Sequence, residues 1–185
     1  ACCFLGYLYQ GPPFRFGYQG LGEPLCWLAF GPFAYSAVLI ALNPSNIFFE
    51  DIPWEVSLLL GSGPSLATTL VLFCSHFHQI SEDKKHGKNS PLVRLGAKKG
   101  SQFVPWIIFT IYVFQLFTIV YGFIPVFCIL YLLSFPHAIR LINLLKSSYA
   151  KPSAIKNCKF VAVKFQTLNG IGLITGLIFN YLLNK

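Results

Sequence analysis

The sequence predicts an all-α fold, a polytopic bundle of transmembrane helices with about five full spans. Only 11% of its 185 residues are charged and 55% are hydrophobic, whereas a typical soluble domain has about 25% charged residues. Four stretches contain no Asp, Glu, Lys or Arg, namely residues 25–42, 56–80, 103–139 and 165–184. About 20 apolar residues cross the hydrocarbon core of a bilayer as a helix, so these stretches leave no room for a separate soluble domain.

The stretch 103–139 is too long for one span, since transmembrane helices usually contain about 17–25 residues. Gly122 and Pro125 lie near its middle and favour a turn there. We therefore expect two spans, at about 103–120 and 123–139. One long kinked helix is the alternative.

The positions of the basic residues favour two spans over one kinked helix. If five spans alternate in direction, all of the 14 Lys and Arg except Lys185 lie on one side of the membrane. The opposite side receives residues 43–55, which carry Glu50, Asp51 and Glu55. Because cytoplasmic loops carry an excess of Lys and Arg, the basic side is predicted to be cytoplasmic or stromal. The net charge of +8 then reflects loop orientation and contact with lipid headgroups or a phosphorylated substrate, not nucleic acid.

The remaining elements follow in order along the chain. Residues 1–9 are typical of the end of a span, and residues 10–22 contain too much Gly and Pro for a regular helix. The expected spans and loops are then 23–42, the acidic loop 43–55, 56–80, the charged loop 81–101, 103–120, 123–139, a basic interfacial segment 140–160 that contacts lipids, and 163–184. In the last span, Gly172 and Gly176 are four residues apart, which suits close helix packing. The six cysteines show no C-x-x-C spacing and are expected to act as small apolar side chains.

The end of the second span carries the residues that suggest chemistry. A helix through this region would place His76, Gln79 and Asp83 on one face. Glu82 would lie about 100° away around the helix and would join them if the helix frays. Polar groups at the edge of a membrane are costly unless they are used. Oxygen ligands suit Mg²⁺, which binds through one or two carboxylates and the phosphates of a substrate. The alternative is that Glu82 and Asp83 only pair with neighbouring lysines in a solvated loop.

Cations lie close to these acids in the sequence. Lys84, Lys88 and Arg94 follow them in the same loop, and Arg15 lies in the first loop on the same side. Such groups would neutralise phosphate oxygens that a metal does not reach. For Arg15, an interfacial anchor is the alternative.

Two segments resemble a known family. Residues 79–96, QISEDKKHGKNSPLVRLG, resemble the second aspartate-rich motif of the UbiA superfamily of intramembrane prenyltransferases, and most closely its MenA-type branch. Residues 75–79, SHFHQ, are similar to the cyanobacterial and plastid form that makes phylloquinone. Residues 9–23, YQGPPFRFGYQGLGE, resemble the loop between the fourth and fifth helices of that branch. The resemblance covers essentially the whole chain, more weakly after residue 101.

The resemblance implies an activity and a site. The reaction would transfer a phytyl group from phytyl diphosphate to an aromatic acceptor, 1,4-dihydroxy-2-naphthoate, with loss of carbon dioxide, in a plastid or cyanobacterial membrane. Mg²⁺ would be the cofactor. The implied metal-site residues are Asp83, Glu82, Gln79 and His76, and the implied diphosphate contacts are Arg15, Lys84, Lys88 and Arg94. Tyr9, Phe14 and Tyr18, with Phe16 and Trp27, would form the aromatic wall that a carbocation-like prenyl group needs; plain lipid-facing aromatics are the alternative.

The sequence also departs from the pattern of the family. Ser81 stands where the phylloquinone branch usually has an acidic residue, and Glu82 is expected to substitute for it. The first acidic motif of the family is absent from the sequence. Residues 1–185 are therefore expected to form the C-terminal part of a single membrane-embedded domain with nine helices, or else a degenerate copy.

Two other functions stay open at this point. One is prenyl transfer to another aromatic acceptor, such as homogentisate or a menaquinone precursor. The other is a non-catalytic membrane protein, such as a transporter or assembly subunit. The acidic cluster at the end of a span argues against the second possibility, and the missing first motif argues for it.

Overall fold

The computed structural model describes residues 2–42 and 52–185, and these residues form helices and no strands. Glu50 and Asp51 of the predicted acidic loop lie outside the described residues. The elements are α1 (Cys2–Gln10), α2 (Gly22–Leu28), the π-helical turn η1 (Ala29–Phe33), α3 (Ala34–Leu42), α4 (Trp54–Ser75), η3 (His76–His78), α5 (Ile80–Lys85), α6 (Pro91–Val120), η4 (Val126–Ser134), α7 (Phe135–Ser148), α8 (Pro152–Ile155) and α9 (Cys158–Leu183).

The five predicted spans are confirmed. Within the described residues, five helical segments are long and apolar enough to cross a membrane: Gly22–Leu42, Trp54–His78, Pro91–Val120, Val126–Ser148 and Ser153–Leu183. Three of their bounds were predicted wrongly, because the third span begins before residue 103, the fourth continues past 139 and the fifth begins before 163. The prediction ended these helices where charged residues begin. The helices continue past those residues, because Lys and Arg at a helix end can extend their head groups into water.

The turn that divides residues 103–139 is present, so the alternative of one kinked helix is wrong. α6 ends at Val120, and Gly122 follows with a φ of 72°, a conformation that glycine adopts without strain. The backbone N–H of Phe123 donates to the carbonyl of Thr118 at 2.9 Å and closes the turn. Pro125 is extended and precedes η4.

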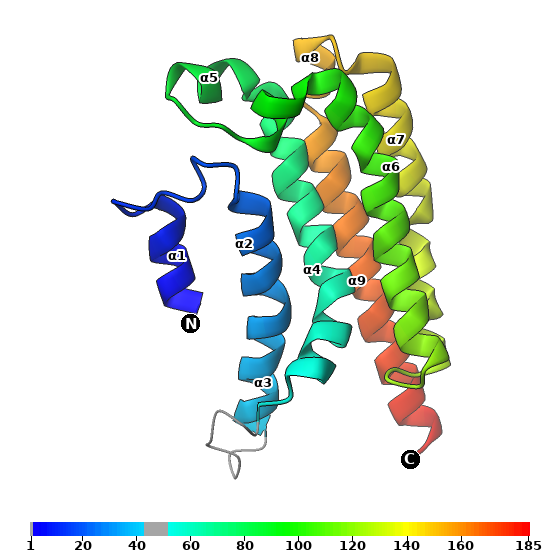
Figure 1. The fold of residues 1–185 in the computed structure, drawn as a ribbon. Helices are drawn as coiled ribbons and strands as arrows, with labels where there is room; N and C mark the ends of the chain where they lie inside the picture. The colour runs from blue at the N-terminus through cyan, green and yellow to red at the C-terminus, as the bar shows by residue number, and fades with distance from the viewer. Residues whose placement is uncertain (1, 43–51) are drawn as a thin grey trace.

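Helix α4 lies at the centre of the bundle. It packs against α2 and η1 on one side and against α6 and α9 on the other, as Figure 1 shows. Its buried Leu70 belongs to one apolar core with Ile111 of α6 and Phe165 of α9. Helix α1 lies at the edge of the bundle beside α2.

The predicted close packing of the last span is confirmed. A Cβ atom added to Gly172 would overlap the carbonyl of Leu130, and one added to Gly176 would overlap the backbone of Cys128. The two glycines therefore allow α9 to lie directly against η4, as small residues do between membrane helices.

The loops divide between the two ends of the bundle as predicted. The loop after α1, helix α5 and helix α8 lie together at one end (Figure 1). The turn after α6 and the C-terminus lie at the other end. The first end carries the motif and the basic segments, so the candidate site is built there.

Candidate functional site

The chain breaks its helix where the motif begins. α4 ends at Ser75, residues 76–78 form a short 3-10 turn, and α5 starts after Gln79, whose φ and ψ are −103° and 0°. The prediction of one helix through this region is therefore wrong. His76 and Asp83 nevertheless meet, because the break turns α5 back: Nδ1 of His76 lies 3.2 Å from Oδ2 of Asp83. Gln79 lies at the joint, where its carbonyl accepts the N–H of Asp83 at 2.7 Å.

Asp83 is buried, with 8% of its surface exposed. Its second carboxylate oxygen, Oδ1, lies 3.6 Å from Nζ of Lys88. The backbone N–H of Lys88 also donates to the carbonyl of Asp83 at 2.8 Å. The carboxylate of Asp83 therefore lies between the imidazole of His76 at Oδ2 and the ammonium group of Lys88 at Oδ1. Asp83 is thus not the solvated loop residue that the alternative prediction required.

Glu82 points away from this cluster. Its side chain is 62% exposed and pairs with Lys85 at 3.6 Å. Lys84 is exposed as well. An exposed pair of this kind contributes little, so the alternative of a solvated ion pair describes Glu82. Glu82 was predicted to join Asp83 and His76, but in the structure its side chain lies apart from them.

The structure instead adds Glu23, which the sequence reasoning missed. Glu23 lies in the first turn of α2, and its Oε1 atom lies 3.6 Å from Nε2 of His76. Its side chain is 12% exposed, and neither carboxylate oxygen accepts a hydrogen bond from any described residue. The signal was available, because an isolated acid at the start of an apolar span is a functional candidate by default.

The first loop, residues 11–21, is bound to the loop that follows α5. The N–H of Asn89 donates to the carbonyl of Tyr18 at 2.7 Å, and the guanidinium of Arg94 donates to the carbonyl of Gln19. Arg15, predicted to contact diphosphate, has a φ of 43° and lies over the ring of Tyr18 at 5.6 Å from its centroid. Arg15 and Arg94, the two arginines predicted to contact diphosphate, therefore both lie at the end of the bundle that carries the motif. Arg94 is hydrogen-bonded to the first loop.

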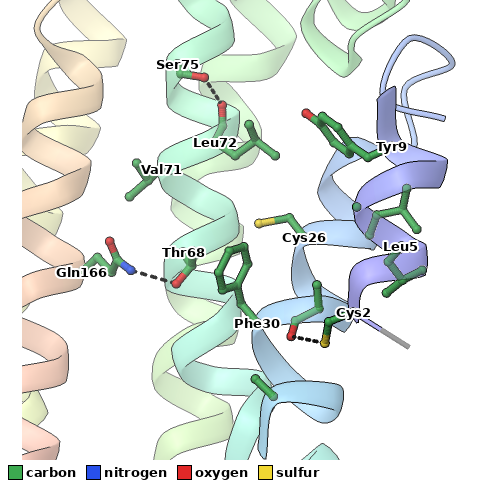
Figure 2. A pocket seen from close by; sticks show the side chains of 14 residues that line it. Cys2, Leu5, Tyr9, Cys26, Phe30, Thr68, Val71, Leu72, Ser75 and Gln166 are labelled. Atoms are coloured by element: carbon green, nitrogen blue, oxygen red, sulfur yellow. Dashed lines mark hydrogen bonds between the residues drawn. The ribbon is translucent and has the colours of Figure 1, made fainter. Parts of the chain in front are cut away.

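A cavity of about 820 Å³ lies below this cluster, between α1, α2, η1, α4 and α9. Figure 2 shows Tyr9 and Ser75 near one end of it and Cys2 and Phe30 toward the other. Ser75 is followed by His76, and Cys26 lies one helical turn after Glu23. One end of the cavity therefore adjoins the charged cluster.

The cavity wall is mostly apolar, with a few polar groups. Its lining residues are Cys2, Leu5, Gly6, Tyr9, Leu25, Cys26, Ala29, Phe30, Ala34, Thr68, Val71, Leu72, Ser75 and Gln166. Gln166 of α9 donates to the hydroxyl of Thr68 at 2.8 Å (Figure 2), and Ser75 donates to the carbonyl of Leu72 at 2.7 Å. An apolar wall with few placed polar groups is typical of ligand cavities. No sequence signal pointed to Gln166, because it lies far from both motifs.

The aromatic residues predicted to form a wall do not all line this cavity. Tyr9 lines the cavity, but among the described residues Phe14 and Tyr18 do not. Phe14 is 46% exposed and contacts Phe16, with ring centroids 5.6 Å apart. Both rings belong to the loop that is hydrogen-bonded to Asn89 and Arg94.

The residues present fit a Mg²⁺ ion that is shared with a diphosphate. Among the described residues no group of three or more His, Cys, Asp or Glu side chains could hold a metal ion alone. Mg²⁺ needs only one or two protein carboxylates when phosphate oxygens and waters complete its shell. Asp83 offers a buried carboxylate whose Oδ1 already faces a cation. A carboxylate is a hard oxygen donor of the type that Mg²⁺ prefers.

The chain resembles known proteins over most of its length. A family model described as the UbiA prenyltransferase family matches residues 1–163. The chain is 38% identical over 176 residues to a 2-carboxy-1,4-naphthoquinone phytyltransferase from Synechocystis sp., which covers 94% of this chain and 54% of the relative. It is 39% identical over 175 residues to a chloroplastic 2-carboxy-1,4-naphthoquinone phytyltransferase from Arabidopsis thaliana, which covers 94% of this chain and 46% of the relative. The chain thus spans about half the length of these curated relatives. No solved structure shows a significant match to it.

Proposed function

We propose that this chain, which belongs to the UbiA prenyltransferase family, is part of a membrane enzyme that transfers a phytyl group from phytyl diphosphate to 1,4-dihydroxy-2-naphthoate in phylloquinone biosynthesis. The observation that carries the proposal is the buried pair of Asp83 and His76 beside one end of an apolar cavity of about 820 Å³. This arrangement suits an amphiphilic donor, with a charged diphosphate head and a long apolar tail. The names of both relatives support the phytyl group and the naphthalene-ring acceptor.

The charged cluster would bind the head of the donor. Asp83 is the proposed carboxylate ligand of Mg²⁺, His76 holds that carboxylate, and Gln79 fixes the backbone of Asp83. When bound, Mg²⁺ would neutralise charge that develops on the departing diphosphate. Glu82 faces solvent beside Lys85 and is not in this proposed set.

Cations around Asp83 would bind the oxygens that the metal does not reach. Lys88 is best placed, because its ammonium group already lies 3.6 Å from Asp83 and is mostly shielded from solvent. Lys84 and Arg15 are exposed at the same end and are free to turn toward a bound diphosphate. Arg94 would act mainly through the loop that it holds, and it reaches the diphosphate only if that loop shifts.

The cavity would hold the apolar part of the donor and exclude water from the reacting carbon. A cation-like prenyl group is stabilised by aromatic faces, and Tyr9 and Phe30 line the cavity. The bond between the prenyl carbon and the diphosphate would break, with diphosphate leaving, as the ring carbon of the acceptor bonds to that prenyl carbon. The bond from this ring carbon to the carboxylate would then break, so that carbon dioxide leaves and its electron pair restores the aromatic ring. The membrane would be that of a plastid or a cyanobacterium, in keeping with the sources of the relatives.

The proposal is tested with the complete protein in isolated membranes. Phytyl diphosphate, 1,4-dihydroxy-2-naphthoate carrying a labelled carboxyl group, and Mg²⁺ are supplied together. Equal amounts of phytylated 1,4-dihydroxynaphthalene and labelled carbon dioxide are expected. Transfer to homogentisate instead would replace the proposed acceptor, and no transfer to any aromatic acceptor would favour a non-catalytic membrane protein.

A further inference from the structure

The imidazole of His76 connects two carboxylates that come from distant parts of the chain. Nδ1 lies 3.2 Å from Oδ2 of Asp83, and Nε2 lies 3.6 Å from Oε1 of Glu23. The ring is 3% exposed, so water does not replace either partner readily. Both nitrogens of this buried ring therefore face a carboxylate, one from the motif and one from α2.

The carboxylate of Glu23 contacts His76 but accepts no hydrogen bond. Both of its oxygens lack a hydrogen bond to the described residues, and Oε1 lies within ion-pair distance of Nε2 of His76. A buried carboxylate is costly unless a cation or donor faces it. Glu23 thus favours a single orientation of the His76 ring, in which Nε2 points at α2 and Nδ1 points at Asp83.

The arrangement assigns Glu23 an indirect role. Because the ring of His76 lies between the two carboxylates, Glu23 and Asp83 are not placed to bind the same metal ion. Carboxylate partners that orient a histidine are a recurring feature of metal sites, and their loss typically lowers metal affinity or activity by about 10- to 100-fold. Glu23 also begins the helix that supplies Leu25 and Cys26 to the cavity wall, so the same contact ties the cavity to the motif.

We infer that Glu23 is a positioning residue: its carboxylate holds the imidazole of His76, which in turn holds the Asp83 carboxylate in place for the metal and the diphosphate. The inference rests on the proposed function, because it concerns the same site. It explains how the site keeps Asp83 fixed although Ser81 replaces a neighbouring acid and Glu82 faces solvent.

The test measures metal binding without turnover. Mn²⁺ is titrated into the complete protein in nanodiscs, with inorganic pyrophosphate present, and free Mn²⁺ is followed by electron paramagnetic resonance. Glu23→Gln, which removes the charge but keeps the shape, is expected to weaken Mn²⁺ binding by about 10- to 100-fold. Glu23→Asp, which keeps the charge on a shorter side chain, is expected to lie between Glu23→Gln and the wild type. Glu55→Gln is the matched control, because Glu55 also lies in the first turn of a spanning helix but is exposed, and it is expected to bind as the wild type does.

A double-variant comparison separates positioning from general loss of structure. If Glu23 acts through His76, then Glu23→Gln should have little further effect on Mn²⁺ affinity in a His76→Asn background. An equal loss in both backgrounds would overturn the inference, and so would unchanged Mn²⁺ affinity in Glu23→Gln alone. The melting temperature of each variant shows whether it is folded. Where Glu23→Gln does not fold, the Glu23→Asp variant decides by the same comparison.

Failure of this inference is distinct from failure of the proposed function. The Mn²⁺ titration uses only metal and pyrophosphate, so its result does not depend on the acceptor. A wild-type protein that transfers phytyl while Glu23→Gln binds Mn²⁺ normally refutes the positioning role alone. A wild-type protein that transfers no prenyl group refutes the proposed function, while the titration still decides whether Glu23 positions His76.

Discussion

The Nδ1 atom of His76 lies 3.2 Å from the Oδ2 atom of Asp83, although His76 lies in the 3-10 turn η3 and Asp83 lies in the separate helix α5. The break at Gln79 changes the direction of the chain between the two residues and makes the contact. Both side chains are buried.

Replacing Asp83 with Asn should abolish most of the Mg²⁺-dependent phytyl transfer. The amide cannot supply the negative charge that a divalent cation requires, and a loss of about 100-fold or more is expected for one group that stabilises transition-state charge. The rate is measured in membranes that contain equal amounts of each variant. Glu82→Gln is the control, because Glu82 is exposed and paired only with Lys85. Unchanged turnover in Asp83→Asn would refute the assignment of the site.

Replacing Gly6 with Leu should fill the cavity without disturbing the fold. Gly6 lines the cavity, and no atom of the described residues lies within 4 Å of an added Cβ. The leucine side chain would occupy space that the donor needs, so KM for phytyl diphosphate is expected to rise by about tenfold or more, which corresponds to about 1.4 kcal/mol or more. Gly170→Leu is the matched control, because Gly170 has the same free space but does not line that cavity. Equal kinetics of the two variants would mean that the donor does not bind in this cavity.

Replacing Arg94 with Ala should release the first loop from the end of the bundle. The guanidinium donates to the carbonyl of Gln19, and a hydrogen bond from a charged group contributes about 1.5–3 kcal/mol. The fraction of molecules in which the loop is detached is then expected to increase by about tenfold or more. The rate of tryptic cleavage after Arg15 should rise in proportion. The control is Arg140→Ala, since Arg140 is exposed on α7, away from the loop. If cleavage is unchanged while KM for the diphosphate rises, Arg94 contacts substrate directly and does not hold the loop.

Replacing Asn169 with Leu should destabilise the bundle. Gln115 of α6 and Asn169 of α9 exchange two hydrogen bonds, of 2.6 and 3.0 Å, and both side chains are buried. The single change leaves the amide of Gln115 without its partner, at a cost of about 1–2 kcal/mol. Unfolding in mixed micelles measures the loss. The double variant Gln115→Leu with Asn169→Leu should lose less than the sum of the single changes, and strict additivity would contradict the pairing.

The sequence predicted the architecture well because the membrane restricts it strongly. Charge-free stretches and the one-sided distribution of Lys and Arg predicted five spans, and Gly122 with Pro125 predicted the turn between the third and fourth. Backbone groups in a lipid environment must be satisfied within each segment, so hydropathy alone implies helices. The bounds were less accurate, since charged residues at the interface continue the helices.

The sequence by itself determined the family and the membrane bundle, because these depend on local composition and on short runs of residues. Only the tertiary structure decided which side chains meet. In the structure, Glu82 faces solvent, and Phe14 and Tyr18 do not line the cavity. Glu23 of α2 lies against His76, although the two residues are far apart in the sequence. The reason is physical: the break at Gln79 and the bonds from Asn89 and Arg94 to the first loop are contacts between segments. Helical periodicity describes a single segment and carries no information about them.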